Sequence, residues 1–190
     1  MGNIGRQYDG TRHNVGFQLT ALLAERYATD TARLKFDGAI REIRLGGDKV
    51  LLLEPHTLMN RSGQSVRKAV DFYKLEPADL MVVCDDFHLE VGTLRIRAKG
   101  SDGGQKGLAD VIQKMGTNEV PRMRIGVGPV PERWSNIDFV LGKFTPDESA
   151  EVAATLRRAV DGLEAWVAEG IEAAMNRVNG GPVSGSPDNK

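Results

Sequence analysis

Residues Leu80 to Asp86, LMVVCDD, give the clearest indication of the fold class of this chain. Five apolar residues stand in a row and two aspartates follow them directly. A short apolar run of this kind, with Pro77 just before it, is typical of a strand that is buried on both faces. Open α/β sheets bind ligands at the carboxyl ends of such strands. Asp85 and Asp86 are therefore candidates for a functional site, and either carboxylate can orient a nearby imidazole.

The segments on either side of this strand alternate between helical and strand periodicity. On the amino-terminal side, Ser62 is positioned to cap a helix that carries apolar residues up to Tyr73. On the carboxyl-terminal side, the pattern predicts a strand over 93–98, a helix over 107–115 and a strand over 122–128. Strands interleaved with helices in this way predict a layered α/β domain.

The segments farther toward each end of the chain also alternate between helical and strand periodicity. Apolar residues from Phe17 to Tyr27 recur at helical spacing, and segments 39–45 and 50–55 read as a hairpin around Gly46-Gly47-Asp48. The second hairpin strand is apolar on both faces, which predicts a central place in the sheet. The sequence TPDE at 145–148 is a strong helix start, and it opens a helical region that reaches about Val178. We expect one domain over residues 1–180 and a disordered tail over 181–190.

Composition limits the class of protein. The chain has 190 residues, of which 41% are hydrophobic and 27% charged, and its formal net charge is −1. A length of this order fits one domain, and the composition is too polar for a membrane span. A single cysteine, Cys84, excludes an internal disulfide, and no basic-then-apolar leader is apparent. We expect a cytoplasmic protein without a membrane partner.

Several familiar site chemistries are missing from the sequence. Three scattered histidines without paired cysteines or an HExxH pattern do not predict a metal site. Neither a P-loop, nor a GxSxG elbow, nor a dinucleotide-binding glycine pattern is present. Cys84 lies in the apolar strand, where packing is a more common role than nucleophilic attack. We therefore predict no metal and no cofactor.

Basic residues alternate along two of the predicted strands. Arg95, Arg97 and Lys99 point to one face of the first strand, and Arg122 and Arg124 repeat the spacing on the second. Two such rows on one sheet surface suit a phosphate backbone, although a solvated charged face produces the same pattern. The residues by themselves indicate an α/β domain with an acid/base crevice and a phosphate-sized basic surface.

Five ordered blocks of the sequence belong together: GNIGRQYDGTRHNVGF (2–17), TLMNRSG (57–63), DDFHLEVGTLRIRAKGSDGG (85–104), RIGVG (124–128) and DFVLGKF (138–144). In this order they resemble bacterial peptidyl-tRNA hydrolases. The resemblance runs from residue 2 to about residue 180, and its ordered spacing is more specific than any single block. It implies a single domain of three αβα layers, with a mixed twisted β-sheet between helices. It also implies hydrolysis of the ester that joins a peptide to tRNA, with peptidyl-tRNA as partner, no cofactor, no obligate protein partner and a monomeric state.

The resemblance also implies roles for individual residues. His13 matches the histidine that activates water, and Asp85 matches the aspartate that orients this histidine. A neutral imidazole suits a general base at cytoplasmic pH. The remaining implied positions are substrate-binding residues Asn3, Tyr8, Met59 and Asn60, and tRNA phosphate contacts Arg97 and Arg124. From spacing alone, Asn60 is equally explained as a turn or cap residue.

Two positions depart from the pattern of the family. The glycine loop of the family usually reads GGHNGL, whereas residues 103–108 read GGQKGL. Lys106 stands in place of the asparagine, and because an ammonium cannot accept a hydrogen bond, we expect it to meet a phosphate or the ester carbonyl. Family members also carry a strand of the type KLIVGL before Gly2 and Asn3. That strand is absent here, so we expect a natural start upstream and Asn3 on a frayed terminus.

Two other functions remain open from the sequence. A non-catalytic RNA-binding protein on the same scaffold needs only the basic rows, and a hydrolase of small esters needs only the crevice. The combination of His13 and Asp85 with the arginines favours hydrolysis of peptidyl-tRNA.

Overall fold

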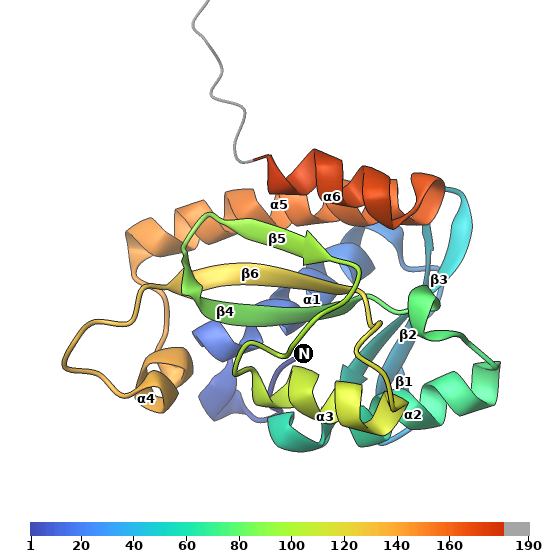
Figure 1. Cartoon of the computed structure of the whole chain (residues 1–190), viewed down its shortest axis with the longest axis horizontal. Helices are drawn as coiled ribbons and strands as arrows, with labels where there is room; N and C mark the ends of the chain where they lie inside the picture. The colour runs from blue at the N-terminus through green and yellow to red at the C-terminus, as the bar shows by residue number, and fades with distance from the viewer. Residues whose placement is uncertain (181–190) are drawn as a thin grey trace, which may run out of the picture.

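A computed structural model describes residues 1–180 of the chain as one mixed α/β domain (Figure 1). The helices are α1 (Val15–Tyr27), α2 (Ser62–Tyr73), α3 (Lys106–Met115), α4 (Asn136–Leu141), α5 (Pro146–Glu169) and α6 (Ile171–Asn179). The strands are β1 (Arg33–Lys35), β2 (Gly38–Leu45), β3 (Asp48–Pro55), β4 (Val82–Glu90), β5 (Leu94–Arg97) and β6 (Arg122–Gly128). Short 3-10 turns are η1 (Arg6–Tyr8), η2 (Arg12–Asn14), η3 (Met59–Arg61) and η4 (Pro77–Asp79). The predicted tail, 181–190, lies outside the described residues.

The strands form two small sheets. In the first, β1, β2 and β3 are antiparallel neighbours, and β2 pairs with β3 from Gly38 opposite Pro55 to Leu45 opposite Asp48. In the second, β6 lies between β4, to which it is parallel, and β5, to which it is antiparallel. The predicted hairpin and the α/β single domain are confirmed. The expected single sheet is instead divided in two, and β3 lies at an edge because β2 is its only strand partner in the described chain.

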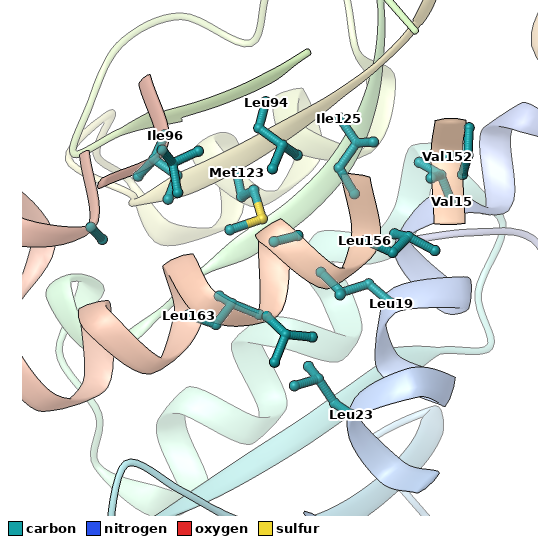
Figure 2. Close-up of a cluster of buried hydrophobic side chains, with 14 of the residues drawn as sticks. Val15, Leu19, Leu23, Leu94, Ile96, Met123, Ile125, Val152, Leu156 and Leu163 are labelled. Carbon is teal, nitrogen blue, oxygen red and sulfur yellow. The ribbon is translucent and has the colours of Figure 1, made fainter. Parts of the chain in front are cut away.

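The sheet of β4, β5 and β6 lies between two apolar layers. On one face, residues of α1, α5 and α6 pack against β5 and β6, and Figure 2 shows Leu19, Leu156 and Met123 within this cluster. On the other face, Leu108 and Val111 of α3 pack against Val82 and Cys84 of β4. Apolar packing on both faces explains why residues 80–84 form a continuous apolar run. This arrangement also brings Asp85 to the middle of the domain.

The N-terminal segment lies against β4. Residues 1–4 form no strand, and the α-amino group of Met1 donates a hydrogen bond of 2.6 Å to the carbonyl of Val83. Burial lowers the pKa of this amino group. Gly16, in the first turn of α1, permits the close approach, because a Cβ there would lie 2.2 Å from the Met1 nitrogen. The strand expected upstream of Met1 stays a prediction.

Several predicted boundaries are corrected. Strand β4 continues past Asp86 to Glu90, with an irregular register that still reaches Gly128 of β6. Ser62 is the first residue of α2 and donates its hydroxyl to the carbonyl of Met59, so it does not cap the helix. The long C-terminal helical region is two helices, because Gly170 adopts a φ of 91° that ends α5. Thr145 and Glu148 form the predicted capping box of α5.

Candidate active site

A buried arginine fixes the short turn that carries His13. In η2, the guanidinium of Arg12 donates to both carboxylate oxygens of Glu148, at 3.0 and 2.8 Å, and to the carbonyl of Lys143 at 2.6 Å. It also lies over the ring of Phe139, 4.4 Å from the ring centroid. Hydrogen bonds from two nitrogens of one guanidinium, to the Glu148 carboxylate and to the Lys143 carbonyl, restrain both the position and the orientation of Arg12. The turn ahead of α1 is therefore anchored to the segment that leads into α5.

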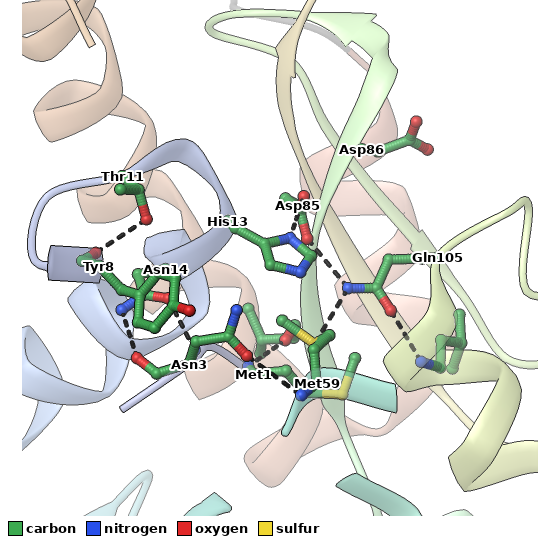
Figure 3. A network of polar contacts seen from close by, with 12 residues as sticks. Met1, Asn3, Tyr8, Thr11, His13, Asn14, Met59, Asp85, Asp86 and Gln105 are labelled. Carbon is green, nitrogen blue, oxygen red and sulfur yellow. Dashed lines mark hydrogen bonds and ion pairs between the residues drawn. The ribbon is translucent and has the colours of Figure 1, made fainter. Parts of the chain in front are cut away.

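His13 meets Asp85 directly. The His13 Nδ1 lies 2.8 Å from Asp85 Oδ2, although the two residues are 72 positions apart in sequence. Asp85 is only 3% exposed, whereas 15% of the His13 side chain is exposed. Figure 3 shows the other ring nitrogen of His13 directed away from Asp85, toward Asn3 and Met59. The predicted imidazole and carboxylate are thus brought together, and part of the imidazole remains exposed.

Asn3 is held firmly instead of fraying. Its backbone N–H donates to Asn14 Oδ1 at 2.8 Å, and the Asn14 amide nitrogen donates back to the Asn3 carbonyl at 2.9 Å. The Asn3 Oδ1 accepts from the backbone N–H of Met59 at 3.1 Å. The expectation of a frayed Asn3 was wrong because Asn14 and Met59 supply the support. With Oδ1 occupied, the Nδ2 group remains as a hydrogen-bond donor.

Gln105 completes the group around Asp85, and the sequence did not single it out. Its Nε2 donates to Asp85 Oδ1 at 3.0 Å and lies 3.4 Å from the sulfur of Met59. Its Oε1 accepts from the backbone N–H of Leu108 at 2.8 Å, which caps α3. In the sequence, the one sign of a special role was that Gln105 stands where the family loop usually has histidine. The contact with Asp85 depends on tertiary packing.

The other predicted substrate residues lie around this group in different ways. Met59 is buried under the site, and Gly107 allows α3 to approach it, since a Cβ there would meet the Met59 sulfur at 2.6 Å. Asn60 is exposed in η3, directly after Met59. Lys106 is exposed as the first residue of α3, next to Gln105. Tyr8 is half-buried in η1, and its carbonyl accepts from the Thr11 hydroxyl at 2.8 Å.

The basic rows differ in how accessible their members are. Arg95 lies opposite Arg124 and Arg97 lies opposite Arg122, and Arg95 and Arg97 are both exposed. Arg124 is engaged, since it donates to Asp86 Oδ2 and to the Ser101 carbonyl, both at 3.0 Å.

Arg122 is an internal structural residue. It is 1% exposed, and its guanidinium donates to the carbonyls of Gly100, Ser101 and Val120. It therefore does not contribute to the basic surface that its spacing predicted. The accessible basic surface is formed by Arg95, Arg97, the partly exposed Arg124 and the exposed Lys99, which pairs with Glu119 at 3.2 Å.

Over residues 1–180, we also examined Cys84 as a nucleophile, clusters of metal-ligating side chains and helices that could cross a membrane. Burial raises the pKa of the Cys84 thiol to about 12, which makes a thiolate nucleophile unfavourable. Among residues 1–180, no group of three or more His, Cys, Asp or Glu side chains is placed to hold a metal ion. None of the helices over the same residues has the length and apolar character needed to cross a membrane.

The geometry at His13 suits attack by water on a carbonyl. A carboxylate holds one imidazole nitrogen, which leaves the other as a proton acceptor. An amide donor, Asn3 Nδ2, lies on the accessible side, where it can stabilise negative charge on oxygen. The buried Asp85 supplies the charge that stabilises an imidazolium.

The chain is similar to known proteins over nearly its whole length. A family model described as peptidyl-tRNA hydrolase matches residues 1–186. The peptidyl-tRNA hydrolase of Rhodopirellula baltica is 49% identical over 179 residues, which cover 94% of each chain. That of Symbiobacterium thermophilum is 48% identical over 181 residues, which cover 94% of this chain and 96% of the relative. The crystal structure of peptidyl-tRNA hydrolase from Acinetobacter baumannii superposes with a TM-score of 0.88 at 32% identity, over 95% of this chain and 92% of that chain.

Proposed function

The chain belongs to the peptidyl-tRNA hydrolase family, and we propose that His13, oriented by Asp85, is the general base with which it cleaves its substrate. The chain is an ester hydrolase that acts on peptidyl-tRNA. The contact of 2.8 Å between His13 Nδ1 and Asp85 Oδ2 is the observation that carries the assignment of the base. The alternative of an RNA-binding protein without catalysis does not require this buried pair.

The proposed reaction begins with proton transfer from water to His13 Nε2. The water oxygen forms a bond to the ester carbonyl carbon, and the carbonyl oxygen becomes negatively charged. When this intermediate collapses, the bond between the carbonyl carbon and the ribose oxygen breaks, and the imidazolium returns its proton to that oxygen. Asp85 stays ionised and stabilises the imidazolium. The products are a tRNA with a free ribose hydroxyl and a peptide acid, which releases a proton to solvent.

Asn3 is the proposed donor to the developing oxyanion. Its Oδ1 is occupied by the Met59 N–H, so its Nδ2 is the atom available to the substrate. Asn60, Tyr8 and Met59 are proposed to border the peptide and the terminal ribose, and Lys106 to meet a phosphate or the ester carbonyl. The assignments of Asn60, Tyr8 and Met59 rest on the resemblance of their local motifs, whereas that of Lys106 rests on its positive charge and its exposed place next to Gln105.

Replacing Asn3 by Asp is expected to lower kcat by about 10² to 10³-fold, the loss typical of one oxyanion donor. The carboxylate still accepts from the Met59 N–H, but it places negative charge where the oxyanion forms. Steady-state hydrolysis of an N-blocked aminoacyl-tRNA measures the loss, and thermal unfolding of the variant checks that the fold is kept. A kcat within threefold of the parent would exclude Asn3 as the donor.

Arg97 and Arg124 are proposed to hold tRNA phosphate. Arg97→Ala is expected to weaken tRNA binding and to reduce the slope of log affinity against log salt by roughly 0.7 to 0.9 for one lost phosphate contact. Arg124→Ala is expected to act in the same direction, while kcat at saturation is kept. Arg33→Ala, which removes an exposed arginine on β1 in the other sheet, is the matched control. An Arg97 variant with an unchanged salt slope would contradict the phosphate contact.

We further propose that the protein acts as a cytoplasmic monomer without an obligate partner. The side chains around His13, from Asn3, Asp85 and Gln105, all come from one chain, which supports a site that is complete in a single copy.

The function is tested by release of an N-blocked amino acid from its tRNA, run beside hydrolysis of a small ester with the same acyl group. The proposed function predicts much more efficient cleavage of the tRNA ester, because the basic surface contributes binding energy. Equal efficiency for both substrates would favour a general esterase.

A further inference from the structure

Three hydrogen bonds connect the first turn of α3 to His13. The Leu108 N–H donates to Gln105 Oε1 at 2.8 Å, Gln105 Nε2 donates to Asp85 Oδ1 at 3.0 Å, and Asp85 Oδ2 lies 2.8 Å from His13 Nδ1. Each link joins residues of different elements: α3, the loop before it, β4 and η2. Figure 3 shows the side chains of Gln105, Asp85 and His13 in this order.

The orientation of the Gln105 amide follows from its contact with Leu108. A backbone N–H can only donate, so the atom that faces it must be the amide oxygen. The NH₂ group of the same amide then faces Asp85, and because this group can only donate, Asp85 Oδ1 must accept. Gln105 therefore makes Oδ1 of Asp85 a hydrogen-bond acceptor, while Oδ2 faces His13.

The contacts of Asp85 also determine which nitrogen of His13 carries the hydrogen. If Oδ1 accepts from Gln105 and the carboxylate carries no proton, Oδ2 must accept as well, and His13 Nδ1 must carry the hydrogen. In the neutral imidazole, the lone pair then lies on Nε2, the nitrogen that points toward Asn3 and Met59. The neighbouring Asp86 is paired with Arg124 at 3.0 Å, which compensates its charge.

We propose that Gln105 is a positioning residue that keeps Asp85 an acceptor at both oxygens and thereby holds His13 in the tautomer with hydrogen on Nδ1. This inference rests on the proposed role of His13 as general base. Gln105 does not need to touch the substrate for this role. Its effect on catalysis passes through the carboxylate and the imidazole.

Two substitutions of Gln105 separate the positioning role from the capping role. In Gln105→Glu, a carboxylate oxygen still accepts from the Leu108 N–H, but no N–H remains for Asp85, and a second negative charge faces it. In Gln105→His, one ring nitrogen can accept from Leu108 while the other donates to Asp85. Gln113→Glu makes the same change of charge at an exposed position on α3 and is the matched control.

The test combines kinetics with a direct reading of the tautomer. Gln105→Glu is expected to lower kcat about tenfold to a hundredfold, the range for loss of a partner behind a reactive group, with a smaller change in KM. Gln105→His is expected to recover most of the rate, and Gln113→Glu to match the parent. The ¹⁵N chemical shifts of His13 in the free enzyme are expected to show hydrogen on Nδ1 in the parent and in Gln105→His, and a mixture of tautomers in Gln105→Glu.

Two results would overturn the inference. One is a Gln105→Glu enzyme with the parental kcat, and the other is an unchanged pattern of His13 tautomers in that variant. If the tautomer responds to Gln105 while His13→Ala remains fully active, the positioning contact is real and the proposed base is wrong. The spectroscopic reading therefore separates the two failures.

Discussion

His13→Ala is expected to lower kcat by about 10² to 10⁴-fold, the range for loss of a general base, while tRNA affinity stays nearly unchanged. His13 Nε2, the imidazole nitrogen that does not contact Asp85, is the group proposed to take a proton from water, and alanine leaves no acceptor there. The exposed Arg95 and Arg97 lie on β5 and are kept in this variant, so binding of the tRNA should persist. Hydrolysis of an N-blocked aminoacyl-tRNA, together with a binding measurement on the same preparation, separates the two effects.

His88→Ala is the matched control for this substitution. His88 is exposed on β4, and its backbone N–H, which alanine retains, donates to Asp86 Oδ1 at 2.9 Å. Its loss is expected to change kcat by less than the loss of His13. A His13→Ala enzyme with a kcat within a few-fold of the parent would refute the assignment of the base.

Asp85→Asn is expected to lower kcat by about 10³ to 10⁴-fold, as for the corresponding change in serine protease triads. Both carboxylate oxygens of Asp85 face donors, Gln105 Nε2 on one side and His13 Nδ1 on the other. An asparagine has only one acceptor oxygen, so its NH₂ group must confront one of these donors or force His13 into the other tautomer. The amide also supplies no charge to stabilise an imidazolium.

We expect the Asp85→Asn protein to stay folded at the assay temperature, so that its lower kcat does not result from unfolding. Thermal unfolding is to be measured beside kcat, because Asp85 is buried and the substitution leaves an unfavourable contact. Asp86→Asn changes the neighbouring aspartate, which pairs with Arg124, and is expected to reduce kcat less. If Asp85→Asn retained parental kcat in a folded protein, Asp85 would be a structural residue only.

Local patterns in the sequence predicted much of the fold. The strand at 122–128 and the hairpin around Gly46 were predicted from turn residues and apolar runs, which are local signals. The division into two sheets was not predicted, because strand pairing depends on contacts between distant segments. The apolar character of 50–55 suggested a central strand, but β3 contacts α1 and α2 and has only one strand neighbour among the described residues.

The candidate site was only partly visible in the sequence. The contact of His13 with Asp85 was anticipated, and their catalytic roles stay predictions. The supports of the site are Arg12, Asn14 and Gln105, whose partners Glu148, Asn3 and Asp85 lie 136, 11 and 20 positions away in sequence, so local spacing carried no signal for them. The same limit applies to Arg122, where alternation on a strand predicted the correct face but could not show that carbonyl groups enclose the guanidinium.

A double-mutant cycle measures whether His13 and Asp85 act as one catalytic unit. Single-turnover cleavage of an N-blocked aminoacyl-tRNA is measured for the parent, His13→Ala, Asp85→Asn and the double variant. Because Asp85 acts through His13, the double variant is expected to be no slower than His13→Ala, within a few-fold. If the rate of the double variant falls by the product of the two single fold-losses, the residues act independently. That result would contradict a role of Asp85 through His13.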